Sequence, residues 1–117
     1  MIGVEKGQCV RVVPSRIKAG AVREWLAAHE KHHSAAVRRQ PGFVKKLLLQ
    51  AEEDEGSVAM LLVWGSSEQA VAWTKHPEHD LVGEPLREFA DTAGGRVSAM
   101  ARGGWTVLAV VEPGDAA

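Results

Sequence analysis

The chain has 117 residues and a formal net charge of −1, with 45% hydrophobic and 25% charged residues. This length suits one domain over residues 1–117, with a core of about 8–112 and a short polar C-terminal tail. The balanced charge argues against nucleic acid and membrane surfaces as partners, and without a long apolar run or a secretory signal we expect a cytoplasmic protein.

The chain begins with a predicted strand, QCVRVV at residues 8–13, which Pro14 should end because proline cannot donate a ladder hydrogen bond. Its one cysteine, Cys9, is expected to be a buried, unreactive thiol. Residues 15–40 are a predicted helix, because apolar side chains recur on one face with a helical period. The residues on or beside that face are Val22, Trp25, Leu26, His29, His32, His33, Ala36 and Val37. The histidines should therefore point inward or toward the rim of the fold.

Two strands joined by an acidic turn follow the helix. Pro41-Gly42 breaks the helix, and FVKKLLLQ at residues 43–50 is the next predicted strand. AEEDEG then suits a hairpin loop before the strand SVAMLLVW at residues 57–64. This strand is apolar at odd and even positions alike, so both of its faces should be covered.

The next predicted helix starts at a serine cap, at residue 66 or 67, and runs to about Lys75. His76-Pro77 is expected to break this helix. A further helical stretch is predicted over residues 85–93, because proline suits the first turn of a helix and a glycine pair follows.

A last predicted strand, WTVLAVVE at residues 105–112, completes the order β-α-β-β-α-β. This order is typical of the ferredoxin-like unit of the α+β class, an antiparallel sheet with helices on one face. The strands 57–64 and 105–112 are apolar on both sides, so the face without helices would expose a large apolar patch. We therefore expect a homodimer formed through the sheet faces.

Two tryptophans mark a candidate binding site. Trp64 ends a predicted strand and Trp73 lies on the following helix, so both should flank the space between helices and sheet. Core packing is the ordinary role of such side chains. The functional alternative is a flat-walled pocket for a planar aromatic ligand.

The histidines are candidates for other chemistry. The four-residue spacing of His29 and His33 could place two imidazoles on one metal ion, and His76 and His79 lie in a predicted loop. No HExxH motif or third ligand supports a metal site, so we assign none. The remaining interpretations are hydrogen-bonded structural histidines and one histidine acting as a base in a pocket. No glycine-rich phosphate loop or GxSxG motif indicates another reaction.

The segments RRQPGFVKKLLLQ and VAMLLVWGSSEQAVAWTKHPEHD resemble the antibiotic biosynthesis monooxygenase (ABM) family. In that family a PGF-type turn opens the second strand, here residues 41–43, and a tryptophan ends the third, here Trp64. The resemblance covers roughly residues 9–111. It implies a dimeric α/β barrel with a pocket in each protomer. Members include cofactor-free oxygenases of polyketide aromatics, quinol monooxygenases and haem-degrading enzymes.

The polar residues of the polyketide-oxidising members are absent here. Those members have an Asn four residues before the strand-ending Trp and a Tyr six residues after it, where this chain has Met60 and Ala70. In these two positions the resemblance therefore supplies no polar partner for a substrate.

Haem-degrading members use an Asn on the first strand, a helix Trp and a later His. Trp73 matches the tryptophan, whereas the other positions correspond to about Val13 and Gly83. His76 and His79 lie about a turn earlier than the family's histidine. Haem ligation would need one of them to reach the iron.

The resemblance does not choose among these activities, and with the inward face of the first helix we predict a cofactor-independent monooxygenase that oxidises a small aromatic molecule, a quinol or a polyketide-like compound, with O₂. His29 or His33 would remove a phenolic proton, and the electron-rich anion would pass an electron to O₂ in a dry cavity. The expected substrate-binding residues are Trp25, Met60, Trp64, Trp73, His76 and His79. Two alternatives stay open: a haem-binding or haem-degrading enzyme, and a non-catalytic small-molecule-binding dimer of the same fold.

Overall fold

The fold is known from a computed structural model, which describes residues 4–91 and 105–114. The described strands form one antiparallel sheet in the order β1-β3-β2-β4. The strands are β1 (Cys9–Arg16), β2 (Phe43–Ala51), β3 (Asp54–Trp64) and β4 (Trp105–Val111). The predicted α+β, ferredoxin-like fold is confirmed.

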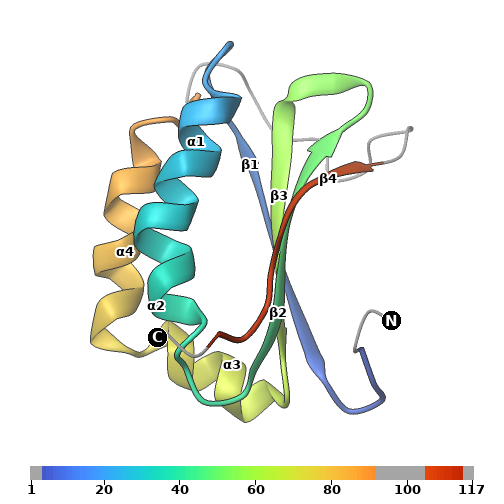
Figure 1. The fold of residues 1–117 in the computed structure, drawn as a ribbon, viewed down its shortest axis with the longest axis vertical. Helices are drawn as coiled ribbons and strands as arrows, with labels where there is room; N and C mark the ends of the chain where they lie inside the picture. Colours follow the sequence, from blue (N-terminus) through green and yellow to red (C-terminus); the bar gives the residue numbers. More distant parts are fainter. Residues whose placement is uncertain (1–3, 92–104, 115–117) are drawn as a thin grey trace.

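The helices pack together on one face of this sheet (Figure 1). The helix between β1 and β2 is continuous but has three segments: α1 (Val22–Ala28), a π-helical segment η1 (His29–Ser34) and α2 (Ala35–Val37). After β3 come α3 (Ser67–Thr74) and α4 (Pro77–Arg87). In the part of the chain that the structure describes, no helix is both long enough and apolar enough to cross a membrane.

Strand β1 is longer than the sequence pattern predicts. It continues through Pro14, which lies opposite Ala59, and ends at Arg16, so the helix begins at Val22 rather than at residue 15. Proline is tolerated because β1 is an edge strand, which leaves half of its amides without a ladder partner. Cys9 is half-buried rather than fully buried, and its thiol is free.

Helix α4 also departs from the prediction. His76-Pro77 ends α3, as predicted, but no loop follows. Pro77 is the first residue of α4, which contains His79, and the ring of His76 caps this helix by accepting from the Glu78 N–H at 3.0 Å. The helix predicted over residues 85–93 is wrong, since Pro85 lies in the last turn of α4. Residues 92–93 of that prediction lie outside the described residues.

The turn at Pro41-Gly42 is built against the start of α3. Gly42 has φ +83°, a conformation that side-chain-bearing residues rarely adopt, and its carbonyl accepts from the Gly65 N–H at 2.8 Å. The side chain of Gln69 packs over Gly42 so closely that an added Cβ would lie 2.1 Å from it. Ser66 caps α3, as predicted, by accepting from the Gln69 N–H. The turn therefore holds α3 beside the start of β2.

Helices cover only one of the two faces of the sheet. The described core lies between helices and sheet in two clusters, around Trp64 with Trp73 and around Trp25 with Leu48. On the opposite face, which carries no helix in Figure 1, apolar side chains of the edge strands remain exposed. These are Val10, Val12, Val107 and Val110, with exposed fractions of 44–58%.

Candidate functional site

A π-helical turn brings three polar side chains to the inner face of the first helix. Hydrogen bonds in a π-helix join residue i to i+5, so side chains five apart lie nearly above one another. In η1 this places Ser34 above His29, with His33 beside them. All three are buried, whereas His32 is half-buried. The histidines were predicted to point inward or toward the rim, and His29 and His33 point inward while His32 is half-buried.

A buried lysine faces these side chains from the sheet. Lys46 of β2 is 0% exposed, and its Nζ lies 2.9 Å from His29 Nδ1, 2.8 Å from His33 Nδ1 and 2.9 Å from Ser34 Oγ. An ammonium group has three N–H donors, and these three acceptors match them. The cluster of Lys46, His29, His33 and Ser34 is called the buried lysine cluster below.

Sequence reasoning missed Lys46 and Ser34. A signal for the lysine was present, because Lys45 and Lys46 are adjacent in an apolar strand, and strand alternation sends neighbouring side chains to opposite faces. One lysine therefore had to face the helices. Ser34 carried no such signal, since it joins His29 and His33 only because the helix widens there.

Burial controls the protonation of the cluster. It lowers the pKa of His29 to about 3 and that of His33 to about 2, and the charge of Lys46 adds to both shifts. Burial also lowers the pKa of Lys46 to about 7, with Glu30 opposing the shift and Arg38 adding to it. Near neutral pH the imidazoles are therefore uncharged, while the lysine can hold or release its proton.

Two adjoining cavities lie between the helices and the sheet. The histidine cavity, of about 300 Å³, includes Trp25, His29, His33, Met60 and His79 in its lining. The tryptophan cavity, of about 190 Å³, includes Trp64 and Trp73 and shares Val13, His33, Met60 and His79 with the first. The sequence-predicted site residues thus line one or both cavities, except for His76.

The aromatic rings of the site form a continuous series. Ring centroids are 4.7 Å apart for Trp25 and His29, 5.4 Å for His29 and His33, 6.1 Å for His33 and Trp73, and 6.4 Å for Trp73 and Trp64. Trp64 and Trp73 are also core residues, so they pack the fold and line a cavity at once. Among the described residues the buried Nε1 of Trp73 has no hydrogen-bond partner.

Two more histidines, His76 and His79, lie beside Trp73. The ring of His76 lies 5.7 Å from that of Trp73 and is not part of either cavity lining, because its Nδ1 caps α4. His79 lies in the lining of both cavities, and its Nδ1 is 3.1 Å from Asp80 Oδ1. Within residues 4–91 and 105–114, no group of three or more potential metal ligands occurs.

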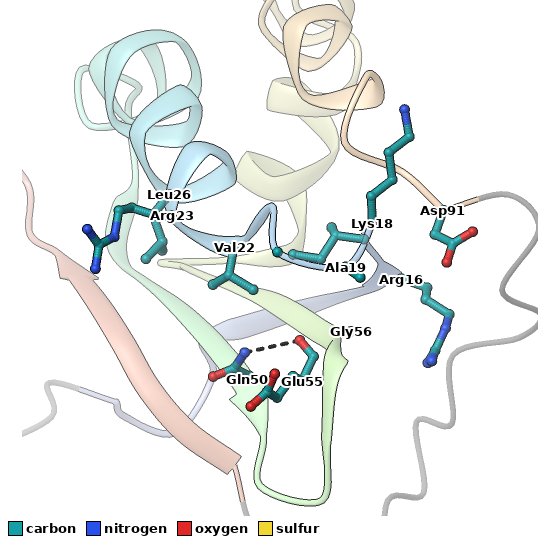
Figure 2. Close-up of a pocket in the computed structure, with 12 residues that line it drawn as sticks. Arg16, Lys18, Ala19, Val22, Arg23, Leu26, Gln50, Glu55, Gly56 and Asp91 are labelled. Carbon is teal, nitrogen blue, oxygen red and sulfur yellow. Dashed lines mark hydrogen bonds between the residues drawn. The ribbon is translucent and has the colours of Figure 1, made fainter.

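A larger cavity lies elsewhere, between the start of α1 and the β2–β3 hairpin (Figure 2). Its volume is about 530 Å³, and Figure 2 shows Arg16, Lys18 and Glu55 around it. Arg16 is already paired with Asp54 at 2.6 Å. Since its described lining contains no histidine or tryptophan, we place the candidate site at the two smaller cavities despite their size.

The family model of the antibiotic biosynthesis monooxygenases matches residues 10–82. A crystal structure of a candidate monooxygenase from Fusobacterium nucleatum resembles the chain with a TM-score of 0.62 at 12% sequence identity. The match covers 79% of this chain and 41% of that one, so this chain spans about two fifths of that protein's length. At such low identity the likeness shows the fold alone. No curated protein matches the chain.

Proposed function

The chain belongs to the antibiotic biosynthesis monooxygenase family, and from this we propose that it oxidises a small aromatic quinol or polyketide-like phenol with O₂ and without a cofactor. The observation that carries the proposal is the pair of buried, uncharged imidazoles, His29 and His33, in the lining of an aromatic-walled cavity. A volume of about 300 Å³ lies at the small end of the usual range of ligand pockets, so the substrate has one or two rings.

The proposed reaction consumes one phenol and one O₂ and forms one quinone and one water. The site accepts the phenolic proton, and the phenolate passes an electron to O₂. The two radicals combine at the ring carbon that bears hydrogen, and the peroxide receives the first proton back. Loss of the carbon-bound proton then breaks the O–O bond, so one oxygen becomes the new carbonyl and the other leaves as water.

The cavity walls are proposed to hold the ring. Trp25 and Met60 would contact it in the histidine cavity, while Trp64 and Trp73 would receive a second ring in the adjoining space. The unpartnered Nε1 of Trp73 is available to donate to a substrate oxygen. We assign His76 a supporting role, because its ring packs against Trp73.

We also propose that no haem is used. His76 is committed to the cap of α4 and lies outside both cavity linings, so it does not fit an iron ligand there. The other histidine beside Trp73, His79, has its Nδ1 3.1 Å from Asp80 Oδ1. A haemin titration should leave the Soret band as it is for free haemin. A saturable, shifted Soret band would overturn this part of the proposal and indicate His79 as the ligand.

Oxygen consumption with hydroquinone or naphthohydroquinone tests the function. We expect the protein to consume O₂ and form the hydroxylated quinone above the rate without protein. A His29→Gln/His33→Gln variant should lose about 100-fold in kcat/KM, a common loss when an acid–base group is removed. His32→Gln is the matched control, because His32 lies on the same segment outside the cavity linings. Tight quinol binding without O₂ consumption would instead identify a non-catalytic binding protein.

A further inference from the structure

The geometry of the buried lysine cluster restricts where the imidazole protons can be. When Lys46 is an ammonium group, its N–H groups donate to Nδ1 of His29 and to Nδ1 of His33. Each Nδ1 must then offer a lone pair, so each uncharged ring carries its hydrogen on Nε2. In this state both rings are N–H donors on the side away from the lysine, and neither can accept a phenolic proton.

Loss of one proton from Lys46 changes this arrangement. The amine has two N–H groups and one lone pair, so it can donate to Ser34 and to one histidine and accept from the other. The accepting contact requires one ring to carry its hydrogen on Nδ1. The Nε2 of that ring then has a free lone pair, and the ring is part of the cavity lining.

We propose that Lys46 is the proton acceptor of this site and that His29 or His33 relays the proton to it from the substrate. The inference rests on the proposed function. The phenolic proton binds Nε2 while the Nδ1 hydrogen moves to the lysine amine, so the imidazole ends uncharged and the lysine ends as an ammonium group. One proton enters the ring and one leaves it.

The surroundings of the cluster favour this route over a charged imidazole. Burial makes the imidazolium form costly, which is why the pKa values of His29 and His33 lie far below neutrality, whereas that of Lys46 is about 7. From the helix, the charged groups that act on Lys46 are Glu30 and Arg38.

The sheet places apolar residues directly beside Lys46, and the charged Arg11 of β1 lies on the same face, one strand further away. The neighbours of Lys46 in the sheet are the apolar Leu62 of β3 and Val111 of β4. Lys45 points to the other face and pairs with Glu112 at 3.4 Å. Burial and the opposing charges of Glu30 and Arg38 therefore govern the pKa of the lysine.

Nitrogen NMR of the labelled full chain tests the relay without any turnover. At pH values above the pKa of both histidines and below that of Lys46, we expect both rings as Nε2–H tautomers. One ring should change to Nδ1–H with the same midpoint at which Lys46 loses its proton. Lys45→Met should keep this coupled transition and Lys46→Met should abolish it. The relay would be overturned if both rings kept their Nε2–H tautomers while Lys46 titrates. It would also be overturned if the lysine stayed charged well above neutral pH.

The pH profile of hydroquinone-dependent O₂ consumption separates the relay from the proposed function. In the wild type kcat/KM should rise with pH to a plateau whose midpoint equals that of the lysine, and Lys46→Met should lower the plateau about 100-fold and remove this limb. Lys45→Met should stay within about twofold, as its side chain lies on the opposite face. A coupled NMR transition without O₂ consumption would refute the function alone, and O₂ consumption without the transition would refute the relay alone.

Discussion

At the scale of single residues, the site is defined by which polar side chains are buried. Lys46 is removed from water yet has three acceptors, so its burial leaves no donor unsatisfied. His29 and His33 share this lysine and gain a fixed orientation from it. The side chains that give the cavity its chemistry are therefore also the ones whose protonation is coupled to folding.

Acid should destabilise the protein through the two buried histidines. Their pKa values fall from 6.5 in the unfolded chain to about 3 and about 2, so between these values the unfolded chain binds more protons than the folded one. The free energy of unfolding should thus decrease as pH falls from about 6.5 toward about 3. Urea denaturation across this range should show a flatter profile for His29→Gln/His33→Gln. Parallel profiles for the variant and the wild type would contradict the assignment.

Lys46 should also make the free energy of unfolding increase with pH, but over a higher pH range than the histidines. Its pKa is 10.5 in the unfolded chain and about 7 in the folded one, so the unfolded chain again binds more protons in this window. The lysine's contribution to the free energy of unfolding should rise between about pH 7 and about pH 10. Urea denaturation of Lys46→Met, compared with Lys45→Met, should lack this rise. If Lys46→Met still showed this rise, another group would be its cause.

At the scale of elements, the position of the helices depends on two irregular features. The π-helical segment η1 widens the first helix where it crosses β2, which turns Ser34 toward Lys46. The turn at Gly42 holds the start of α3 through Gln69. Both are departures from regular geometry, and η1 supplies His29 and His33 to the lining of the histidine cavity.

Gly42→Ala should destabilise the fold by about 1–2 kcal/mol, because a Cβ is unfavourable at this φ and would also force the end of the Gln69 side chain to shift. Gly7→Ala is the matched control: Gly7 also has a positive φ, but nothing lies within 4 Å of its added Cβ. Gly42→Ala should lose more free energy of unfolding than Gly7→Ala, and the double variant Gly42→Ala/Gln69→Ala should recover this difference. Equal losses for Gly42→Ala and Gly7→Ala in urea denaturation would show that the contact with Gln69 has no effect.

At the scale of the whole molecule, the sheet face opposite the helices is left uncovered in the described part of the chain. Its exposed valines lie on β1 and β4, at the two edges of the sheet, and Leu61 of β3 lies between them, half-buried. An apolar face of this kind is typical of surfaces that pack against another sheet. We propose that a second copy of the chain covers it.

Sedimentation should show a homodimer at micromolar concentration, and Val12→Asp/Val110→Asp should shift it to monomer, because a carboxylate in a packed sheet interface is left without a partner. Val71→Asp is the control, since Val71 is exposed on α3, away from this face. A wild type that sediments as a monomer would refute the proposed dimer. So would a Val71→Asp control that dissociates as much as Val12→Asp/Val110→Asp.

The sequence by itself determined the order of the elements, the family and the inward face of the first helix. These follow from local patterns: the helical period through Trp25, His29 and His33, and the turn residues Pro41-Gly42. The errors came at prolines, where an edge position accepted Pro14 and a first-turn position let Pro77 begin α4 where a loop was predicted.

Only the tertiary structure decided that Lys46 meets His29 and His33, that Ser34 joins them and that His76 lies outside the cavities. A lysine is exposed by default, and its burial depends on acceptors from another element placed within reach. The register of β2 against β3 and the widening of the helix at η1 supply that placement. Such contacts join residues distant in sequence, so their geometry is set by packing, and no local pattern of the chain encodes it.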